Sequence, residues 1–317
     1  MFRNATKVVI AAMCCANTLM ATAQDYPLRP IRMLAGPPGG SSDFAARLIV
    51  QGLTTALGQP VIMDNRSGAV QAIMLAARAP RDGYTLLFYG SSLWTGPLID
   101  SFQYDPMRDF SPVTLAMLIP SVLMVHPSVP VNSVKELISL AKAKPGQINY
   151  GSGPSGSTSH VYAELFKSMT DTSLTRIPYG GGGPATRALI GGEVQVLFGT
   201  IVDAKSNIQA GRARGLGVTS AQRVPTLPDI PTIAASGAPG YEGVQRAGIF
   251  APAGTPAAIV TRLQLEIARV LNKDDVRQRF ANVDMQVLTS TPQEFARVIK
   301  DEMARLAPVL KKLGAQP

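Results

Sequence analysis

The stretch of sequence that decides the fold is Leu34-Ala35-Gly36-Pro37-Pro38-Gly39-Gly40-Ser41-Ser42-Asp43, in which an apolar run leads through glycines into the start of a helix. Residues 31–34 are typical of a strand, and apolar residues recur at helical spacing over 44–57. The first turn of a helix has backbone N–H groups without helical partners and carries partial positive charge. Glycines let a ligand approach that backbone closely. This junction therefore predicts a cradle for a carboxylate or phosphate, although serines that only cap the helix explain a single copy more simply.

Two further segments repeat this arrangement. Over 148–160 a short strand leads through glycines, serines and Thr158 into a helix. Over 177–186 a run of four glycines follows a strand, and Pro184 suits the first turn of the next helix. Ligands bind at the carboxyl ends of the strands in open α/β sheets. Three such segments therefore predict one shared cleft, in which loops from two facing sheets hold the two ends of a small anion.

The first 23 residues have the layout of a cleavable secretory signal. Arg3 and Lys7 precede an apolar run over 8–20, and Ala21-Thr22-Ala23 stands before Gln24. The apolar run is shorter than the roughly 20 residues that a membrane-spanning helix needs. We therefore expect export to the periplasm, with cleavage after about Ala23.

Composition limits the classes of partner. The chain has 317 residues, of which 46% are hydrophobic and 16% are charged, as in an ordinary globular protein. Both cysteines, Cys14 and Cys15, fall within the expected signal, so no disulfide or cysteine-based metal site is expected in the mature chain. The 30 basic residues exceed the 21 acidic ones, but they are scattered, and the single Trp94 has no basic neighbours. Nucleic-acid binding needs clustered basic residues with aromatic platforms, so no nucleic-acid partner is expected.

Strand-like runs alternate with helix-like segments, which is typical of an α/β fold with largely parallel pairing. The expected strands are 31–34, 61–63, 85–88, 121–125, 174–177, 194–198 and 216–219. Two apolar segments, 121–126 and 247–251, are expected to cross side by side between two lobes. The predicted boundaries give lobe 1 residues 24–122 and 249–317, and lobe 2 residues 123–248. Such two-crossover connectivity permits hinge closure around a ligand.

The chain offers little for catalysis. A nucleophile needs an adjacent base, and the only histidines are His126 and His160. His160 follows the second glycine segment, and it is open to three interpretations: a ligand contact, a base, or a packing residue. The stretch 153–157 breaks the Gly-x-Ser-x-Gly pattern at its last position. Two distant histidines without mature cysteines leave no usual metal site, so we expect neither an enzyme nor a metalloprotein.

A nucleotide-dependent secreted enzyme is the alternative. Residues 151–156 satisfy the dinucleotide pattern Gly-x-Gly-x-x-Gly after a possible strand. The acidic residue expected about 20 positions later has only Asp171 as a candidate, and Asp171 lies before the next strand. None of the glycine runs leads into the Gly-Lys-Ser/Thr of a phosphate loop. No cofactor is therefore expected.

Asp203 is a polar candidate from the second lobe. It follows the expected strand 194–198 by a short turn, so it could reach the cleft from the carboxyl end of that strand. There it would repel an anion unless the ligand also carries an amine or hydroxyl donor. The other interpretation makes Asp203 the N-cap of a helix that begins at Ala204.

Short motifs from about Tyr26 to the C-terminus carry a family resemblance. They are Tyr26-Pro27 with Pro30-Ile31, Gly39-Gly40-Ser41-Ser42-Asp43, Leu57-Gly58-Gln59-Pro60-Val61, Asn65-Arg66, Asp82-Gly83-Tyr84-Thr85-Leu86, Asp109-Phe110, Tyr150-Gly151-Ser152, Gly180-Gly181-Gly182 with Pro184, and Phe250-Ala251-Pro252-Ala253-Gly254-Thr255-Pro256. In this order and spacing the chain resembles the Bug-type receptors, the extracytoplasmic solute-binding subunits of tripartite tricarboxylate transporters. The resemblance implies a two-lobed periplasmic binding protein (type II-like), with two mostly parallel sheets, flanking helices and two crossover strands. It also implies that the protein closes on a small carboxylate and delivers it to the permease subunits in the membrane.

The resemblance further implies which loops form the pocket. They are the loop after the first strand and the glycine and serine loop of lobe 2, with the stretch after the third strand and the turn at 179–181 completing the rim. The expected ligand-binding residues are Gly39, Gly40, Ser41, Ser42, Asp43, Ser91, Ser92, Ser152, Gly153, Ser155, Gly156, Ser157, Thr158, Tyr179, Gly180, Gly181 and Asp203. A monomer is expected, and a sensor that presents its liganded form to a signalling kinase is a further alternative.

Two positions depart from the family pattern. After Asn65-Arg66 that pattern continues Pro-Gly-Ala-Gly-Gly, whereas this chain has Ser67-Gly68-Ala69-Val70-Gln71. Before the returning crossover an aromatic residue such as Trp is common, and this chain has Arg246. Arg246 could pair with a second carboxylate in the cleft, or it could face solvent. Both departures leave the identity of the bound carboxylate open.

Overall fold

The structure is a computed structural model that describes residues 26–36, 38, 41–66, 70–99, 101–154 and 156–314. The expected signal, residues 1–23, lies outside these ranges, as do Gly39, Gly40, Ser155 and the side chain of Ser41. None of the helices in these ranges is both long enough and apolar enough to cross a bilayer.

Strands and helices alternate along most of the chain, which confirms the predicted α/β class. The strands are β1 (Ile31–Ala35), β2 (Val61–Asn65), β3 (Thr85–Gly90), β4 (Phe110–Val125), β5 (Asn149–Ser152), β6 (Thr175–Pro178), β7 (Val196–Thr200), β8 (Arg214–Val218), β9 (Val244–Pro252) and β10 (Gln286–Val287). The helices are α2 (Ser41–Leu57), α3 (Gln71–Ala77), α4 (Ser92–Thr95), α5 (Val134–Ala143), α6 (Thr158–Thr170), α7 (Gly182–Ile190), α8 (Ile201–Gln209), α9 (Ala257–Leu271), α10 (Asp274–Ala281) and α11 (Pro292–Gly314), with 3-10 turns η1 (Gly96–Leu98) and η2 (Ala234–Ser236).

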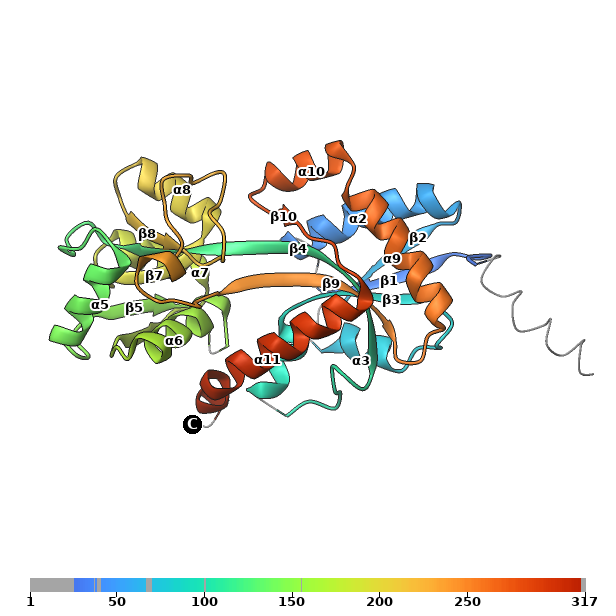
Figure 1. The fold of residues 1–317 in the computed structure, drawn as a ribbon, viewed down its shortest axis with the longest axis horizontal. Coiled ribbons are helices and arrows are strands. Elements are labelled where there is room, and N and C mark those ends of the chain that lie inside the picture. Colours follow the sequence, from blue (N-terminus) through green and yellow to red (C-terminus); the bar gives the residue numbers. More distant parts are fainter. Residues whose placement is uncertain are drawn as a thin grey trace, which may run out of the picture.

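The strands form one mixed sheet path in the order β2-β1-β3-β9-β4-β7-β5-β6, and β8 and β10 also pair with β4. Near one end β1 pairs in parallel with β2 and β3, and near the other end β5 pairs in parallel with β6 and β7. We call the parts of the molecule around these groups the first half and the second half. The long strands β4 and β9 are antiparallel to each other and run side by side between the halves (Figure 1).

The two crossover strands exist, but the paired residues differ from the expected ones. Residues 110–120 of β4 pair with 244–252 of β9. The expected crossover segment 121–126 does not lie beside 247–251, because residues 121–125 pair with β7 and β8 of the second half. Prolines and bulges interrupt the apolar pattern over 110–120, so pattern alone did not indicate a strand there.

Each half has its own apolar core. In the first half Ile49 of α2 and Leu263 of α9 pack with Met33 of β1. In the second half Phe166 of α6 packs with Phe198 of β7. Full burial of one such side chain stabilises the fold by about 1.5–3 kcal/mol. The two cores hold the loops at the carboxyl ends of the strands in fixed positions.

The C-terminal helix α11 contacts both cores. Phe295, near its start, packs with Trp94 and Phe250 of the first half. Leu306 and Leu310, near its end, belong to the core cluster of the second half. In Figure 1 this helix runs from beside the first half to the helices of the second half. The elements β4, β9 and α11 therefore connect the halves.

Candidate ligand-binding site

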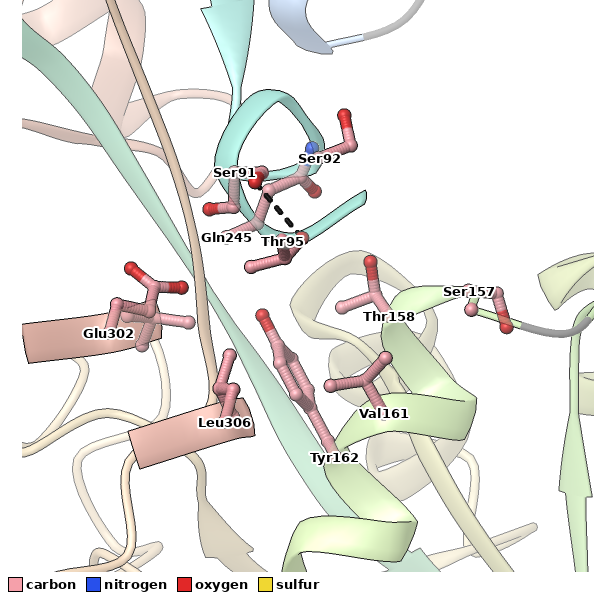
Figure 2. A pocket seen from close by; sticks show the side chains of 12 residues that line it. Ser91, Ser92, Thr95, Ser157, Thr158, Val161, Tyr162, Gln245, Glu302 and Leu306 are labelled. Atoms are coloured by element: carbon pink, nitrogen blue, oxygen red, sulfur yellow. Dashed lines mark hydrogen bonds between the residues drawn. The ribbon is translucent and has the colours of Figure 1, made fainter. Parts of the chain in front are cut away.

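Two adjoining cavities lie where the loops after β3, β5, β6 and β7 meet β9. The first, about 270 Å³, is lined by Gly181 and Gly182 at the start of α7, and we call it the α7 cavity. The second, about 190 Å³, is lined by residues of α4, α6, β9 and α11, and we call it the α11 cavity (Figure 2). Both cavities share Ser157, Thr158 and Gln245 in their walls. A small elongated molecule can therefore extend from one cavity into the other.

The α7 cavity is bounded by the starts of helices from the second half. Thr158 is the first residue of α6, and Gly182 is the first residue of α7. A Cβ atom built on Gly181 or Gly182 would meet no atom within 4 Å, so these glycines leave open space beside the backbone. First-turn N–H groups and the helix dipole favour an anion there. The arrangement suits a carboxylate group.

A third helix start in this cavity, that of α8, is capped by its own residues. The hydroxyl of Thr200 donates to Asp203 Oδ2 at 2.8 Å, and the backbone N–H of Asp203 donates to the Thr200 hydroxyl at 3.1 Å. The N-cap is therefore Thr200, and the expectation that Asp203 caps a helix from Ala204 is wrong. Asp203 still lines the cavity. The start of α8 is occupied by the negative charge of Asp203 and offsets it. The helix starts that remain to bind an anion are those of α6 and α7.

The loop between β5 and α6 is fixed by internal hydrogen bonds. Arg176 donates to Ser152 Oγ at 2.8 Å and to the Gly153 carbonyl at 2.9 Å. The Gly153 N–H donates to Ser159 Oγ at 3.0 Å. Ser152 is fully buried, and it lines neither cavity. The Ser152 hydroxyl and the Gly153 amide therefore shape the loop, and Gly153 also lines the α7 cavity.

His160 anchors the same loop. Its side chain is 2% exposed, and its Nδ1 accepts the Gly156 N–H at 3.1 Å. Burial lowers the pKa of His160 to about 4, and the charge of Arg176 acts in the same direction. A neutral ring can accept this hydrogen bond, whereas a protonated one cannot. Of the three interpretations of His160, the structure supports the packing one.

Gly156 takes a left-handed backbone conformation in this loop, with a φ of 76°. Glycine adopts that conformation without steric cost. A Cβ at this position would also lie 3.2 Å from Ile99 Cδ1, at the end of η1 in the first half. The loop thus lies against both halves.

Several expected residues line neither cavity. They are Ser42, Asp43, Ser152, Tyr179 and Gly180. Asp43 accepts from Arg47 at 2.8 Å and from Asn65 at 2.9 Å, so its carboxylate braces the start of α2. The expected residues that do line a cavity are Ser91, Ser92, Gly153, Gly156, Ser157, Thr158, Gly181 and Asp203.

Ser91 belongs to the wall of the α11 cavity, but its hydroxyl has a structural partner. The backbone N–H of Arg246 donates to Ser91 Oγ at 3.0 Å, and the Ser91 N–H donates to the Arg246 carbonyl at 2.8 Å. Trp94 lies in α4 and is fully buried against Phe250 and Phe295. It therefore contributes to the core and not to the cleft.

In the α11 cavity, sequence reasoning missed several lining residues. They are Thr95, Val161, Tyr162, Val244, Gln245, Glu302 and Leu306. The Tyr162 hydroxyl points into the space among these residues (Figure 2). Gln245 is a polar residue at the start of an apolar strand, and Glu302 and Leu306 are four residues apart on one face of α11. Those two patterns were the available signals, but neither indicates a ligand without the tertiary structure.

Arg246 takes part in a network of ion pairs behind the α11 cavity. Its guanidinium, 11% exposed, lies 2.6 Å from Glu242 and 3.2 Å from Glu302. Arg305 also approaches Glu242, at 3.9 Å. Burial raises the pKa of Glu302, and the charges of Arg246 and Arg305 oppose that rise. Arg246 therefore neither faces solvent nor lines the cleft.

The structure does not support a dinucleotide site at the glycine turn, because the acidic residue expected to bind the ribose does not lie near that turn. Asp171 is the C-cap of α6, whereas residues 151–156 precede the start of that helix. Thirteen helical residues separate these ends by about 20 Å. A ribose beside this glycine turn would be out of reach of Asp171. Among the residues that the structure describes, no group of three or more His, Cys, Asp or Glu side chains could hold a metal ion.

Comparison with known proteins agrees with this architecture. The family model described as "Tripartite tricarboxylate transporter family receptor" matches residues 45–315. Protein BugT of Bordetella pertussis is 35% identical over 301 residues, covering 93% of this chain and 92% of that protein. This similarity confirms the predicted resemblance to Bug-type receptors.

Solved structures of similar proteins include two with bound carboxylates. A protein from R. palustris solved with adipate is 37% identical, with a TM-score of 0.74, and the match covers 92% of this chain and 99% of that one. MatC from Rhodopseudomonas palustris with bound malate is 29% identical, with a TM-score of 0.69, and the match covers 90% of this chain and 100% of that one. These likenesses confirm the predicted fold.

Proposed function

Because this chain belongs to the tripartite tricarboxylate transporter receptor family, a class of periplasmic solute-binding receptors, we propose that it captures a small carboxylate between its two halves. The carboxylate lies at the starts of α6 and α7, and the rest of the ligand extends past Gln245 into the α11 cavity. The protein binds and releases this ligand without covalent chemistry. The observation that carries the proposal is the meeting of two helix starts and an open glycine backbone in one cavity.

The strength of binding follows from the number of hydrogen bonds. A hydrogen bond to a charged group contributes about 1.5–3 kcal/mol. Micromolar binding requires about 8 kcal/mol, so three or more such bonds must act together. The hydroxyls of Ser157 and Thr158 and the first-turn amides of α6 and α7 supply enough donors at the cavity wall. Since internal hydrogen bonds already hold the loop, little ordering entropy opposes binding.

Relatives support the ligand class. The adipate and malate structures show that similar proteins bind short dicarboxylates. The two adjoining cavities, about 270 and 190 Å³, suit an acid of that size. The class proposed here is therefore a short-chain organic acid with one carboxylate in the α7 cavity.

We also propose where the protein acts and which membrane subunits receive its ligand. Residues 1–23 direct export to the periplasm and are removed after about Ala23. The mature monomer then delivers its ligand to permease subunits in the membrane. The lobes we propose are 24–122 with 249–317, and 123–248, with β4 and β9 bending between them. A sensor that presents its liganded form to a kinase uses the same cleft and differs only in its partner.

A thermal-shift screen against a panel of short-chain acids tests the binding proposal. A ligand at 100 times its dissociation constant stabilises the folded protein by about 2.7 kcal/mol. We expect at least one acid of the panel to raise the melting temperature in a concentration-dependent way, and a nicotinamide cofactor to leave it unchanged. Stabilisation by the cofactor with no response to any acid would favour the nucleotide-dependent enzyme instead.

A further inference from the structure

The wall of the α11 cavity presents a carboxylate and no cation. Glu302 lines this cavity with a side chain that is 5% exposed. Among its described lining residues there is no lysine or arginine. In Figure 2 the Tyr162 hydroxyl points into this space, while Glu302 lies across the β9 ribbon from it. A ligand that extends into this cavity therefore meets hydrogen-bond acceptors and neutral groups.

The positive charges near Glu302 are held behind the wall. Arg246 Nη1 donates to Glu302 Oε2 at 3.2 Å, while Arg246 Nη2 donates to Glu242 at 2.6 Å. Arg305 pairs with Glu242 and donates to its backbone carbonyl. Two arginines and two glutamates leave the network without net charge. No cation of this network is available to neutralise a second carboxylate of a ligand.

A second ligand carboxylate would be unfavourable in this cavity. Like charges repel strongly where water is displaced, and the hydroxyls of the wall can donate to that carboxylate but carry no charge that offsets the repulsion. Val161, Val244 and Leu306 form the apolar part of the wall and cannot compensate for that charge. A hydroxyl or ammonium group, by contrast, can donate to Glu302 and to the amide oxygen of Gln245.

We propose that Glu302 is a specificity-determining residue, an inference that rests on the proposed function. It selects a monocarboxylate that carries a hydrogen-bond donor at the end of the ligand opposite the carboxylate. The ligand carboxylate lies at the starts of α6 and α7. The donor, an ammonium or a hydroxyl group, lies in the α11 cavity against Glu302. Dicarboxylates of the same length are disfavoured.

Matched ligand sets test this selectivity in the intact mature protein. For chains of four, five and six carbons, the ω-amino acid, the ω-hydroxy acid and the dicarboxylate are compared by isothermal titration calorimetry. We expect the best donor-bearing acid to bind at least tenfold more tightly than the dicarboxylate of its own length. Equal or tighter binding of the dicarboxylate would overturn this inference while leaving the carboxylate receptor intact. Failure of every acid to bind would overturn both.

Two variants test whether Glu302 causes the preference for the donor-bearing acid. Glu302→Gln removes the negative charge that we place against the ligand. Glu242→Gln removes the other negative charge that pairs with Arg246, and Glu242 lines neither cavity. We expect Glu302→Gln to reduce the preference for the donor-bearing acid to less than threefold, and Glu242→Gln to keep it near the wild-type value. Equal preferences in the two variants would contradict the role of Glu302. Should Glu302→Gln fail to fold, the wild-type ligand series alone decides.

Discussion

At the scale of single residues, His160 shows how a buried polar group can fix a binding loop. Its Nδ1 accepts the Gly156 N–H, and the ring is almost inaccessible to solvent. The unfolded chain protonates this histidine near its ordinary pKa of 6.5, whereas the folded protein does so only near 4. Between those values the unfolded state binds more protons, so the folded state becomes less stable as the pH falls.

This linkage gives a pH-dependence prediction. From pH 6.5 down to about 4, we expect His160 to lower the free energy of unfolding by up to about 1.4 kcal/mol per pH unit. Urea unfolding at several pH values measures the slope. His160→Gln retains an acceptor without titrating, so it should flatten the slope, and His126→Gln should not. Identical slopes in the wild type and His160→Gln would contradict this role of the buried ring.

Arg176 gives a second residue-scale prediction. It holds the loop of the second half through Ser152 and Gly153, while Arg214 makes a similar pair of bonds to the carbonyls of Val129 and Val131. Arg176→Ala should weaken carboxylate binding about tenfold or more, because the loop loses its fixed shape. Arg214→Ala should leave the affinity unchanged, since those carbonyls line neither cavity. Titration calorimetry compares the two, and equal effects would count against a preorganised loop.

Part of the candidate site could be predicted at this scale. Glycines and hydroxyl residues between a strand and a helix indicated Ser157, Thr158 and Gly181, because that chemistry is local in sequence. Gln245 and Glu302 could not be predicted, since tertiary packing of β9 and α11 brings them to the cavity. The family resemblance implied Ser91, but its hydroxyl accepts the Arg246 backbone N–H.

At the scale of elements, the start of α7 is the most exposed part of the proposed anion site. Gly182 lines the α7 cavity, and a Cβ there would meet no atom within 4 Å. Its neighbour Gly183 lies in the same helical turn, lines neither cavity, and would bring a Cβ close only to the end of Arg187, at 3.8 Å. The two positions therefore form a matched pair.

Gly182→Leu should fill the α7 cavity and reduce the affinity for a carboxylate at least tenfold. Gly183→Leu should bind as the wild type does. Gly182→Leu should keep or slightly raise the melting temperature, because leucine favours helix more than glycine does. Gly183→Leu should lower it slightly, because Gly183 is helical and precedes Pro184, where a side chain disfavours the helical conformation. The measurement is calorimetric titration with the best acid from the panel. Equal affinities of the two variants would remove the start of α7 from the site.

The prediction of elements succeeded where the pattern was regular. Short buried strands followed by amphipathic helices were recognised, and the helical spacing over 44–57 ends where α2 ends, at Leu57 before the left-handed Gly58. The crossover was misplaced because β4 is a 16-residue strand with two bulges. A bulge shifts which face a side chain occupies, and proline interrupts the pattern further. The strand was therefore recognised only at its continuously apolar end, residues 121–125.

At the scale of the whole molecule, β4, β9 and α11 extend through both halves. Leu306 and Leu310 of α11 lie in the core of the second half, while Phe295 lies in that of the first. Unfolding one half would expose apolar surface of the other. We therefore expect a single calorimetric transition in which the calorimetric and van't Hoff enthalpies agree. Two resolved transitions would show that the halves unfold independently.

The residue pattern predicted two facing sheets joined by two crossover segments, and the family resemblance implied the same two-lobed arrangement. Alternating strands and helices predict an α/β fold, but they do not say which loops face each other. The second-half loop could be assigned to the site because its glycines lie in one short stretch. The partners from β9 and α11 come from residues more than 80 positions away, which local pattern does not connect.

The central claim is that a carboxylate binds where Ser157 and Thr158 begin α6. Isothermal titration of Ser157→Phe against Ser139→Phe tests it most directly, because Ser157 lines both cavities and Ser139 is exposed on α5. With the best acid from the panel, we predict micromolar binding to the wild type and to Ser139→Phe, and a loss of at least 100-fold in Ser157→Phe at an unchanged melting temperature. Wild-type affinity in a folded Ser157→Phe variant would contradict the account.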